Sequence, residues 1–414
     1  MNDYQARVKK NHETVNCIAR FDSHNSFAEL IETNRKVFEG LRVIYSTNNI
    51  SSEFGLVPLQ GIEKECRIAS KFFGGSGLLF YSDQIYKDTI EKGKINIPLD
   101  YSLTFDSNVA EVFRIYERGG VIQSKETLFE LINFIHQYNF NFDYTFFIIE
   151  NLKYLMDPQN IRPYNTIVAL KRFDFLNYEL FKENPDEPKF DISKEKASKK
   201  AIETIYTFNR SSAVQDLLSR RTAIYVILLK SILLNWELPN NEHENLNKLI
   251  RFCLAKIGKF PKIELYFAWK YLKYGKNFNF FSSIMQPNAK TIKSAKSMSW
   301  DLYSLRLQET LSTGKSRGNF FIPFFSSYDK KFFELSKACP VRSMVIDDEY
   351  EMVNTIFEDE IEFQKDLSDS MDSEITFQLN NHEERAKRLK MDFGLIPLSN
   401  LATQLESKVT KYMH

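Results

Sequence analysis

The spacing of hydrophobic residues along the chain predicts a protein made mostly of helices. Apolar side chains recur three and four positions apart, which is the period of a helix, over several long stretches. These predicted helices cover 27–38, 109–118, 127–138, 201–236, 243–258, 262–274, 290–311 and 332–338. Short apolar runs bounded by turn residues predict strands instead, and they lie at 78–81, 101–108, 319–329 and 341–346. The 414 residues include only 14 glycines, which disfavours a turn-rich sandwich or barrel.

The order of these elements favours an α/β fold in which helices dominate and flank a small parallel sheet. We divide the chain into five regions. Two parts of one α/β core lie at 98–182 and 285–347, and an inserted α-helical region at 183–284 separates them. A mixed region precedes the core at 1–97, and an acidic segment followed by a helical tail covers 348–414.

Two of the predicted strands end in an aspartate. The first runs into Asp106 before a helix begins, and the second runs into Asp329 before another helix. In an open parallel sheet the carboxyl ends of the strands converge on one crevice, where ligands bind. Asp106 and Asp329 are therefore candidates for one shared site. Pro323 removes a backbone donor within the second run, and it favours an edge position for that strand.

Two further acids stand among apolar residues on predicted helices. Glu150 follows the run Phe146-Phe-Ile-Ile149, and Asp301 lies in Trp300-Asp-Leu302. Burying a carboxylate is costly unless it is paired or bound to a metal. Clustered carboxylates raise one another's pKa, and a hard divalent cation such as Mg²⁺ or Mn²⁺ relieves that repulsion. Alternatives to Glu150 as the acid on a helix are Glu126, Glu130 and Glu264.

Other catalytic chemistries find little support in the sequence. The four cysteines show no C-x-x-C spacing, and the six histidines do not pair at the spacing of metal ligands. Gly314-Lys315 lacks the earlier glycine of a phosphate loop, because Glu309 occupies that position. No G-x-S-x-G elbow is present, although a Ser-His-Asp or Cys-His arrangement stays open.

Hydropathy, the N-terminal sequence and the cysteines together indicate a cytoplasmic protein without a membrane partner. The most apolar run, 223–234, contains Lys230 and is too short to span a bilayer. The polar N-terminus shows no signal-peptide pattern. Scattered cysteines without a disulfide framework fit a reducing compartment.

Charge is unevenly distributed along the chain. Residues 347–374 contain 12 acidic side chains and one basic side chain, Lys365, which gives a net charge of −11. Since the whole chain carries +1, the rest carries +12. A basic body is compatible with nucleic-acid binding, whereas a solvated acidic tail beside ordinary surface lysines explains the same charges. The 36 Phe and 20 Tyr are interpreted mainly as core, with a base-stacking surface as the alternative.

The order of the candidate acids resembles that of the PIN-like nuclease superfamily. Those proteins open with a strand that ends in Asp followed by Ser or Thr and Asn, as in Asp106-Ser-Asn108. A helical acid follows, as Glu150 does 44 positions later, and a helix then starts with an aspartate, as at Asp301. Last comes a strand that ends in Asp-Lys before a short helix, as in Asp329-Lys330. The resemblance covers 101–180 and 285–347, under half of the chain, and it requires a long insertion after Glu150.

The resemblance implies a PIN-like sheet and a metal-dependent nuclease, most simply an endoribonuclease in a toxin–antitoxin or phage-defence system. Asp106, Glu150, Asp301 and Asp329 would be the catalytic acids and would hold one or two Mg²⁺ or Mn²⁺ ions. Ser107 would help to bind phosphate, and Asn108 would position a water. RNA is the expected substrate and single-stranded DNA the alternative. Candidates for contacts to its backbone are Lys290, Lys293, Lys296, Arg220 and Arg221.

Two other functions stay open. A non-catalytic helical interaction protein would bind a protein partner through its aromatic-rich helices, or through the helical insertion. It would use the acidic tail for regulation or for mimicry of nucleic acid. A degenerate PIN-like scaffold would keep the fold without a metal. The sequence also leaves homo-oligomerisation open.

Overall fold

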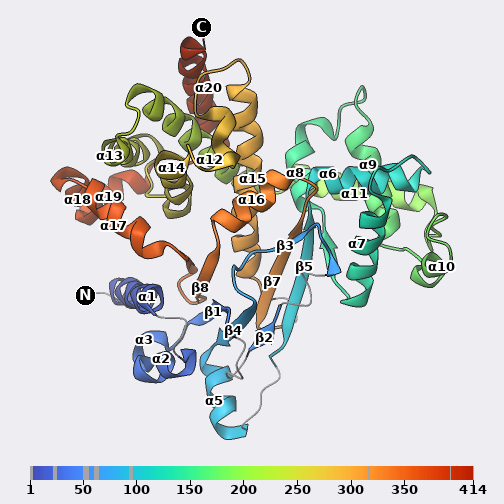
Figure 1. The fold of residues 1–414 in the computed structure, drawn as a ribbon, viewed down its shortest axis with the longest axis horizontal. Coiled ribbons are helices and arrows are strands. Elements are labelled where there is room, and N and C mark those ends of the chain that lie inside the picture. The colour runs from blue at the N-terminus through green and yellow to red at the C-terminus, as the bar shows by residue number, and fades with distance from the viewer. Residues whose placement is uncertain are drawn as a thin grey trace.

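Helices dominate the protein, and two small sheets lie between them (Figure 1). The computed structural model describes residues 3–21, 26–49, 56–59, 65–92, 97–315, 318–391 and 393–413. The chain is therefore an α/β protein with mostly helical structure, as predicted. Within these ranges, none of the helices combines the length and the apolar character needed to cross a membrane.

The smaller sheet carries the strand ends that the sequence singled out. Its strand order is β3-β7-β5-β6. β5 (Leu99–Phe105) pairs in parallel with both β6 (Asn141–Asp143) and β7 (Phe320–Ser326), and β3 (Ala69–Lys71) adds an antiparallel edge beside β7. The carboxyl ends of β5, β6 and β7 therefore open at one edge of this sheet.

β7, the strand that contains Pro323, is an inner strand of this sheet, contrary to the predicted edge position. Pro323 stands opposite Ser102 of β5, in a strand that has β3 on its other side. The pairing with β3 starts only at Phe324. The lost N–H is tolerated because β3 does not reach residue 323.

The larger sheet is antiparallel throughout and has the order β2-β4-β1-β8-β9. Its strands are β1 (Arg42–Thr47), β2 (Val57–Pro58), β4 (Gly77–Tyr81), β8 (Val341–Asp347) and β9 (Met352–Phe357). The strand predicted at 341–346 is thus present as β8, but it does not extend the parallel sheet. Among the strands that the structure describes, parallel pairing joins only β5, β6 and β7, so the prediction of one small parallel sheet is too simple.

Both faces of the larger sheet are covered, which explains why its central strand β1 is buried along its whole length. Successive side chains of a strand point to opposite faces. Val43 and Tyr45 pack with α1 (Asp3–Arg20), α2 (Phe27–Thr33) and α3 (Arg35–Phe38), whereas Ile44 belongs to the main core. Phe80 on that second face meets Phe320 of β7, with ring centroids 4.8 Å apart. The two sheets therefore share one core.

Two groups of helices flank the smaller sheet (Figure 1). The group beside β6 consists of α6 (Ser107–Glu117), α7 (Lys125–Gln137), α8 (Thr145–Asn151), α9 (Arg162–Phe173), α10 (Tyr178–Glu183) and α11 (Lys194–Arg210). The other group consists of α12 (Ser212–Glu237), α13 (Glu242–Phe252), α14 (Lys262–Tyr274), α15 (Thr291–Ser312) and α20 (Leu395–Tyr412). The remaining α-helices of the described residues are α5 (Asp83–Lys92), α16 (Lys330–Ala338), α17 (Glu360–Ser370), α18 (Ser373–Asn380) and α19 (His382–Leu389).

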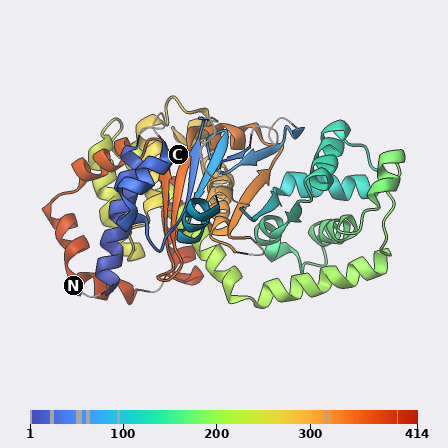
Figure 2. The same cartoon turned by 90° about the horizontal axis from the view of Figure 1, so that it is seen from below.

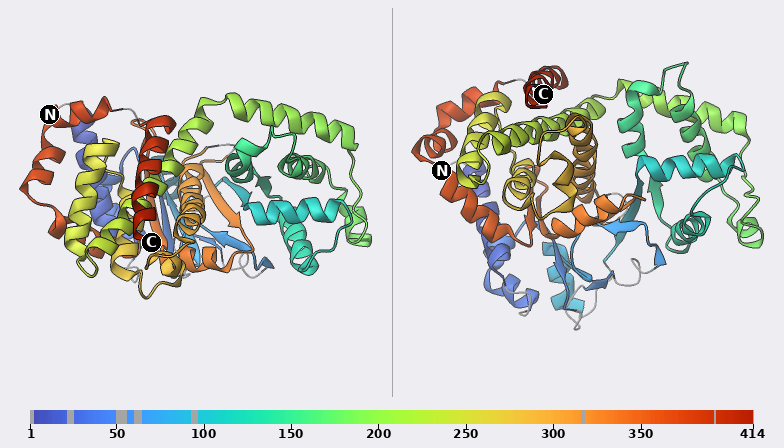
Figure 3. Two further views of the ribbon diagram at one scale, coloured as in Figure 1. Left: turned by 90° about the horizontal axis from the view of Figure 1, so that it is seen from above. Right: turned by 45° about the horizontal axis from the view of Figure 1, so that its top comes forward.

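The predicted insertion at 183–284 is divided between these two groups. α11 packs on α9, whereas α12 packs on α14, α15 and α20. The single helix predicted at 201–236 is in fact two helices that meet at Ser211 and follow each other along one side of the molecule (Figure 2). α20 lies beside α12 (Figure 3). The insertion is therefore an integral part of the packing around the smaller sheet.

The acidic segment 347–374 is folded and is not a solvated tail. It supplies the end of β8, all of β9 and α17, and the start of α18. Its carboxylates pair with basic residues from other elements: Asp347 with Arg7, Asp348 with Arg42, Glu360 with Lys262, Asp366 with Lys273, and Asp372 with Arg251. Much of its negative charge is thus neutralised within the protein, which weakens the hypothesis of a free regulatory tail.

Candidate active site

Asp106 lies at the junction of β5, β7 and α6. Its Oδ1 accepts a hydrogen bond from the backbone N–H of Ser107 at 2.7 Å, which caps α6. Its Oδ2 accepts from the amide of Asn108 and from the hydroxyl of Ser327, both at 2.6 Å. The backbone N–H of Asp106 donates to the carbonyl of Ser326 at 2.9 Å. These four bonds fix the carboxyl group at the edge of the sheet.

Asp329 occupies the equivalent position after β7, where it caps α16. Its Oδ1 accepts from the backbone N–H of Lys331 at 2.8 Å, and its own N–H donates to the hydroxyl of Ser327 at 3.0 Å. The N–H of Tyr328 donates to the side-chain oxygen of Asn108 at 3.0 Å. Both polar ends of Asn108 are therefore used to join the two strand ends.

Glu150 comes from α8, which the chain enters directly from β6. The hydroxyl of Ser107 donates to Glu150 Oε2, and the amide of Asn151 donates to the same hydroxyl at 3.3 Å. The apolar face of α8 is buried, and the ring of Phe146 meets the ring of Phe325 of β7 with centroids 5.1 Å apart. Ser107 thus holds the Glu150 carboxyl group, a contact that the sequence did not predict.

Asp301 lies on α15, whose neighbouring residues Leu302 and Leu305 are buried. Its backbone carbonyl accepts from the hydroxyl of Ser304. Among the residues that the structure describes, none donates a hydrogen bond to its carboxyl group. Asp301 is therefore the acid of the four whose charge is least compensated.

The carboxyl group of Asp301 lies within electrostatic reach of the other three. Burial raises the pKa of Asp301 well above its usual value, and Asp106, Asp329 and Glu150 raise it further, in that order. Burial also raises the pKa of Asp106 despite its hydrogen bonds, and Asp329 adds to the shift. The pKa of Glu150 is raised to about 7, again mainly by burial, with a contribution from Asp106. The four predicted acids are thus brought together by the fold.

The carboxyl groups of these acids are suitable ligands for a hard divalent cation, but their side chains are not arranged around a common metal position. In the described ranges no group of three or more His, Cys, Asp or Glu side chains is arranged to hold a metal ion. Both oxygens of Asp301, Oδ2 of Asp329 and Oε1 of Glu150 accept no hydrogen bond from any described residue. Carboxylate oxygens are the ligands that Mg²⁺ and Mn²⁺ prefer. The residues fit such an ion if their side chains draw closer together.

Two cationic side chains border the acids. Arg221 of α12 has its guanidinium carbon 4.6 Å from the ring centroid of Trp300 and 5.3 Å from that of Tyr225. Burial lowers the pKa of Arg221 to about 10, while the charge of Glu150 acts in the opposite direction. Lys331 of α16 acts on Asp301 and lowers its pKa. The sequence predicted Arg221 but missed Lys331, although the run Asp329-Lys-Lys331 was a usable signal.

The other predicted basic residues lie farther from this chemistry. Lys290 and Lys293 are exposed at the start of α15. Lys296 forms an ion pair with Glu406 of α20 at 2.9 Å. Arg220 acts electrostatically on Tyr303 and Arg306. These residues therefore gain no direct support from the geometry as contacts to a substrate at the acids.

The alternative helical acids have structural partners. Glu130 pairs with Arg67 at 2.7 Å, and Glu264 pairs with Arg306 at 3.6 Å. Glu126 is exposed on α7. Of the four acids considered for the helical position, Glu150 is the one that interacts electrostatically with Asp106 and Asp301.

The fold and site together define a helix-rich α/β protein with four acids at the carboxyl edge of three parallel strands. Comparison of the chain with protein-family models, with curated proteins and with solved structures gives no match in any of the three. The function therefore has to be argued from the site itself.

Proposed function

We propose that this protein is a metal-dependent nuclease with a PIN-like core, most simply an endoribonuclease. One observation carries the proposal. Asp106, Glu150, Asp301 and Asp329 come from four separate elements, yet the charges of the other three all act on the buried carboxyl group of Asp301, at the edge where the parallel strands end. Such repulsion is relieved by a divalent cation. A place in a toxin–antitoxin or phage-defence system rests on the PIN-like resemblance alone.

Asp301, Asp329 and Glu150 offer the unused oxygens that would hold Mg²⁺ or Mn²⁺, with Asp106 beside them. When bound, such an ion lowers the pKa of a water and neutralises charge on the leaving oxygen of a phosphodiester. The residues of the chain would do the rest. Arg221 and Lys331 place positive charge beside the acids for a phosphate. Glu150, with a pKa of about 7, can accept or release a proton near neutral pH.

A second candidate is a PIN-like scaffold without catalytic metal. It is favoured by the finding that the described side chains form no ready metal group. It would use the same fold to bind nucleic acid or a protein, and it predicts no cleavage under any metal. The third hypothesis, an interaction protein with a free acidic tail, is disfavoured by the ion pairs of that segment.

Cleavage assays separate these candidates. Labelled single-stranded RNA and DNA would be incubated with the protein in Mn²⁺, Mg²⁺ or EDTA. The key variant is Asp301→Asn, because no described side chain depends on that carboxyl group for a hydrogen bond. Asp106→Asn is the second variant, and Asp369→Asn on the exposed face of α17 is the matched control.

The nuclease proposal expects metal-dependent cleavage by the natural protein and the control. Both active-site variants should lose more than about 100-fold in rate, which exceeds the usual effect of residues that only support a ligand. Equal cleavage by all proteins would point to a contaminant. Absence of cleavage in every metal, together with absence of Mn²⁺ binding by calorimetry, would favour the scaffold.

A further inference from the structure

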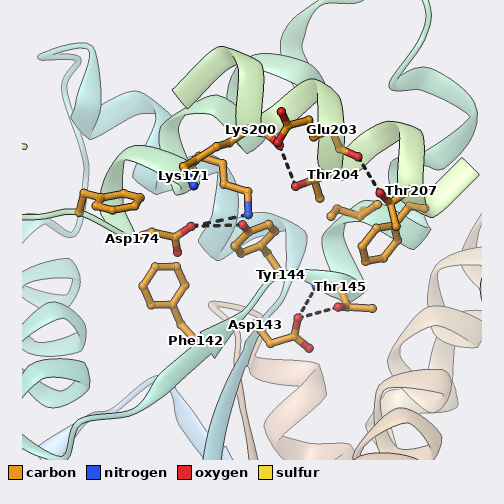
Figure 4. A pocket seen from close by; sticks show the side chains of 13 residues that line it. Phe142, Asp143, Tyr144, Thr145, Lys171, Asp174, Lys200, Glu203, Thr204 and Thr207 are labelled. Atoms are coloured by element: carbon orange, nitrogen blue, oxygen red, sulfur yellow. Dashed lines mark hydrogen bonds and ion pairs between the residues drawn. The ribbon is translucent and has the colours of Figure 1, made fainter. Parts of the chain in front are cut away.

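A cavity of about 640 Å³ opens beside the end of β6 (Figure 4). Its walls come from the end of β6, the start of α8, the end of α9 and the middle of α11. The volume lies within the range of small-molecule sites. Its lining includes Tyr144, Phe175, Lys171, Lys200, Asp143 and Asp174.

The cavity lies at the same edge of the sheet as the four acids. Asp143 stands opposite Thr104 in the β5–β6 pairing, and Asp106 follows Thr104 by two residues. Neighbouring strands lie about 4.8 Å apart and rise about 3.3 Å per residue, so the backbones at Asp143 and Asp106 are about 8 Å apart. Thr145 lines the cavity from α8, the helix that also carries Glu150. The cavity and Asp106 therefore lie on neighbouring strand ends at the same edge of the sheet.

Aromatic rings and lysines alternate around the cavity. The ammonium of Lys171 lies 5.0 Å from the ring centroid of Tyr144, and that of Lys200 lies 5.4 Å from the ring centroid of Phe175. Lys171 and the hydroxyl of Tyr144 both contact the carboxyl group of Asp174, at 3.7 and 3.4 Å (Figure 4). Phe175 and Lys200 are exposed, so a ligand reaches them without opening the core.

Two carboxyl groups supply acceptors. Oδ1 of Asp143 accepts from both the N–H and the hydroxyl of Thr145, at 2.9 and 2.6 Å. No described residue donates to its Oδ2. Burial raises the pKa of Asp143 and of Asp174. These oxygens would be matched by N–H or O–H donors of a ligand.

We infer that this cavity is a subsite for an unpaired nucleotide of the substrate strand, next to the phosphate that is cleaved. The inference rests on the proposed nuclease function. Aromatic faces stack on single-stranded bases, and lysines contact backbone phosphate. Carboxylates accept from the amino groups of bases and from the ribose 2′-hydroxyl. Because a paired base would first have to leave its stack, the subsite selects single-stranded nucleic acid.

Equilibrium binding on the full chain in EDTA tests the subsite without any cleavage. The probes are GMP, AMP, CMP and UMP, with ribose 5-phosphate and inorganic phosphate as partial ligands, and the readout is calorimetry. We expect saturable binding of at least one nucleoside monophosphate. Ribose 5-phosphate should bind about tenfold or more weakly than that nucleotide, because it cannot stack.

Matched variants locate the binding. Phe175→Ala should weaken nucleotide affinity about tenfold, and Lys200→Ala should weaken it and reduce its salt dependence. Lys199→Ala is the control, because Lys199 is an exposed lysine on the same helix that does not line the cavity. Absence of saturable binding, or equal affinity for all three variants, would overturn the inference.

The failures of the two proposals are distinguishable. If RNA is cleaved but no nucleotide binds in EDTA, the subsite is wrong and the nuclease stands. If nucleotides bind and the variants respond as expected while no metal supports cleavage, the nuclease is wrong and the cavity stands as a nucleotide site. In either case the Lys199→Ala control should bind nucleotides with unchanged affinity.

Discussion

Replacing Glu150 with glutamine should change how the stability of this protein depends on pH. The pKa of Glu150 is raised from about 4.5 to about 7 in the folded state, mainly by burial. A carboxyl group with a raised pKa holds its proton more tightly when folded than when unfolded. Its contribution to stability is therefore fully present below about pH 4.5 and is lost as the pH rises through about 7. The side chain is only partly accessible, so solvent screening is limited.

The size of the effect follows from the shift. A difference of about 2.5 pKa units, at about 1.36 kcal/mol per unit, corresponds to about 3 kcal/mol. Glutamine keeps an oxygen that can accept from the hydroxyl of Ser107, but it does not titrate. The free energy of unfolding of Glu150→Gln minus that of the natural protein should thus rise by about 3 kcal/mol between pH 4.5 and pH 8.

Urea unfolding in EDTA at half-unit pH intervals measures this difference. Glu179→Gln on the exposed face of α10 is the control, and its difference should stay flat. A flat difference for Glu150→Gln as well would refute the buried, proton-binding environment assigned to Glu150. Adding Mn²⁺ at pH 8 should stabilise the natural protein more than the variant, because the cation compensates the charge that burial penalises.

Four further substitutions test ion pairs, core packing and backbone conformation. Lys262→Met should destabilise the protein by about 3 kcal/mol, because it leaves the carboxylate of Glu360 buried without its ion pair. Arg251→Met removes a more exposed ion pair and should cost less than about 1 kcal/mol. The midpoints of urea unfolding compare the two variants. Phe146→Ala should cost about 3–5 kcal/mol and slow any metal-dependent cleavage further by moving the helix that carries Glu150. Gly258→Ala should lower the free energy of unfolding by about 1–2 kcal/mol, since its φ of 74° lies in the left-handed region.

The positions of Asp106 and Asp329 could be predicted because their signals are local. Each follows a short apolar run and precedes a helix, and the structure shows each as the cap of that helix. Their proximity also follows from a general rule, since the two strands pair in parallel and end at the same edge. The Ser327 hydroxyl that joins them could not be predicted, because it reaches across 221 residues of sequence to Asp106.

The predictions that were wrong depended on the choice of partner, which a local pattern does not contain. An apolar run at 341–346 indicates a strand, but whether it joins the parallel or the antiparallel sheet depends on β1 and β9. Residues 347–374 look like a solvated acidic tail when charges are counted along the chain. Their partners Lys262 and Lys273 lie 98 and 93 residues before Glu360 and Asp366, on a helix that no local pattern places beside them.

The long insertion is the feature that changed most between sequence and structure, and it bears directly on the site. Asp301 is held by α15, and α15 is held between β7 and α12. α12 also carries Arg221, whose guanidinium stacks against Trp300, the residue next to Asp301. A helix from the insertion therefore fixes the position of one acid and supplies the cation that faces Glu150. A compact core without this insertion would lose both, so the insertion belongs to the proposed active site and is more than an added domain.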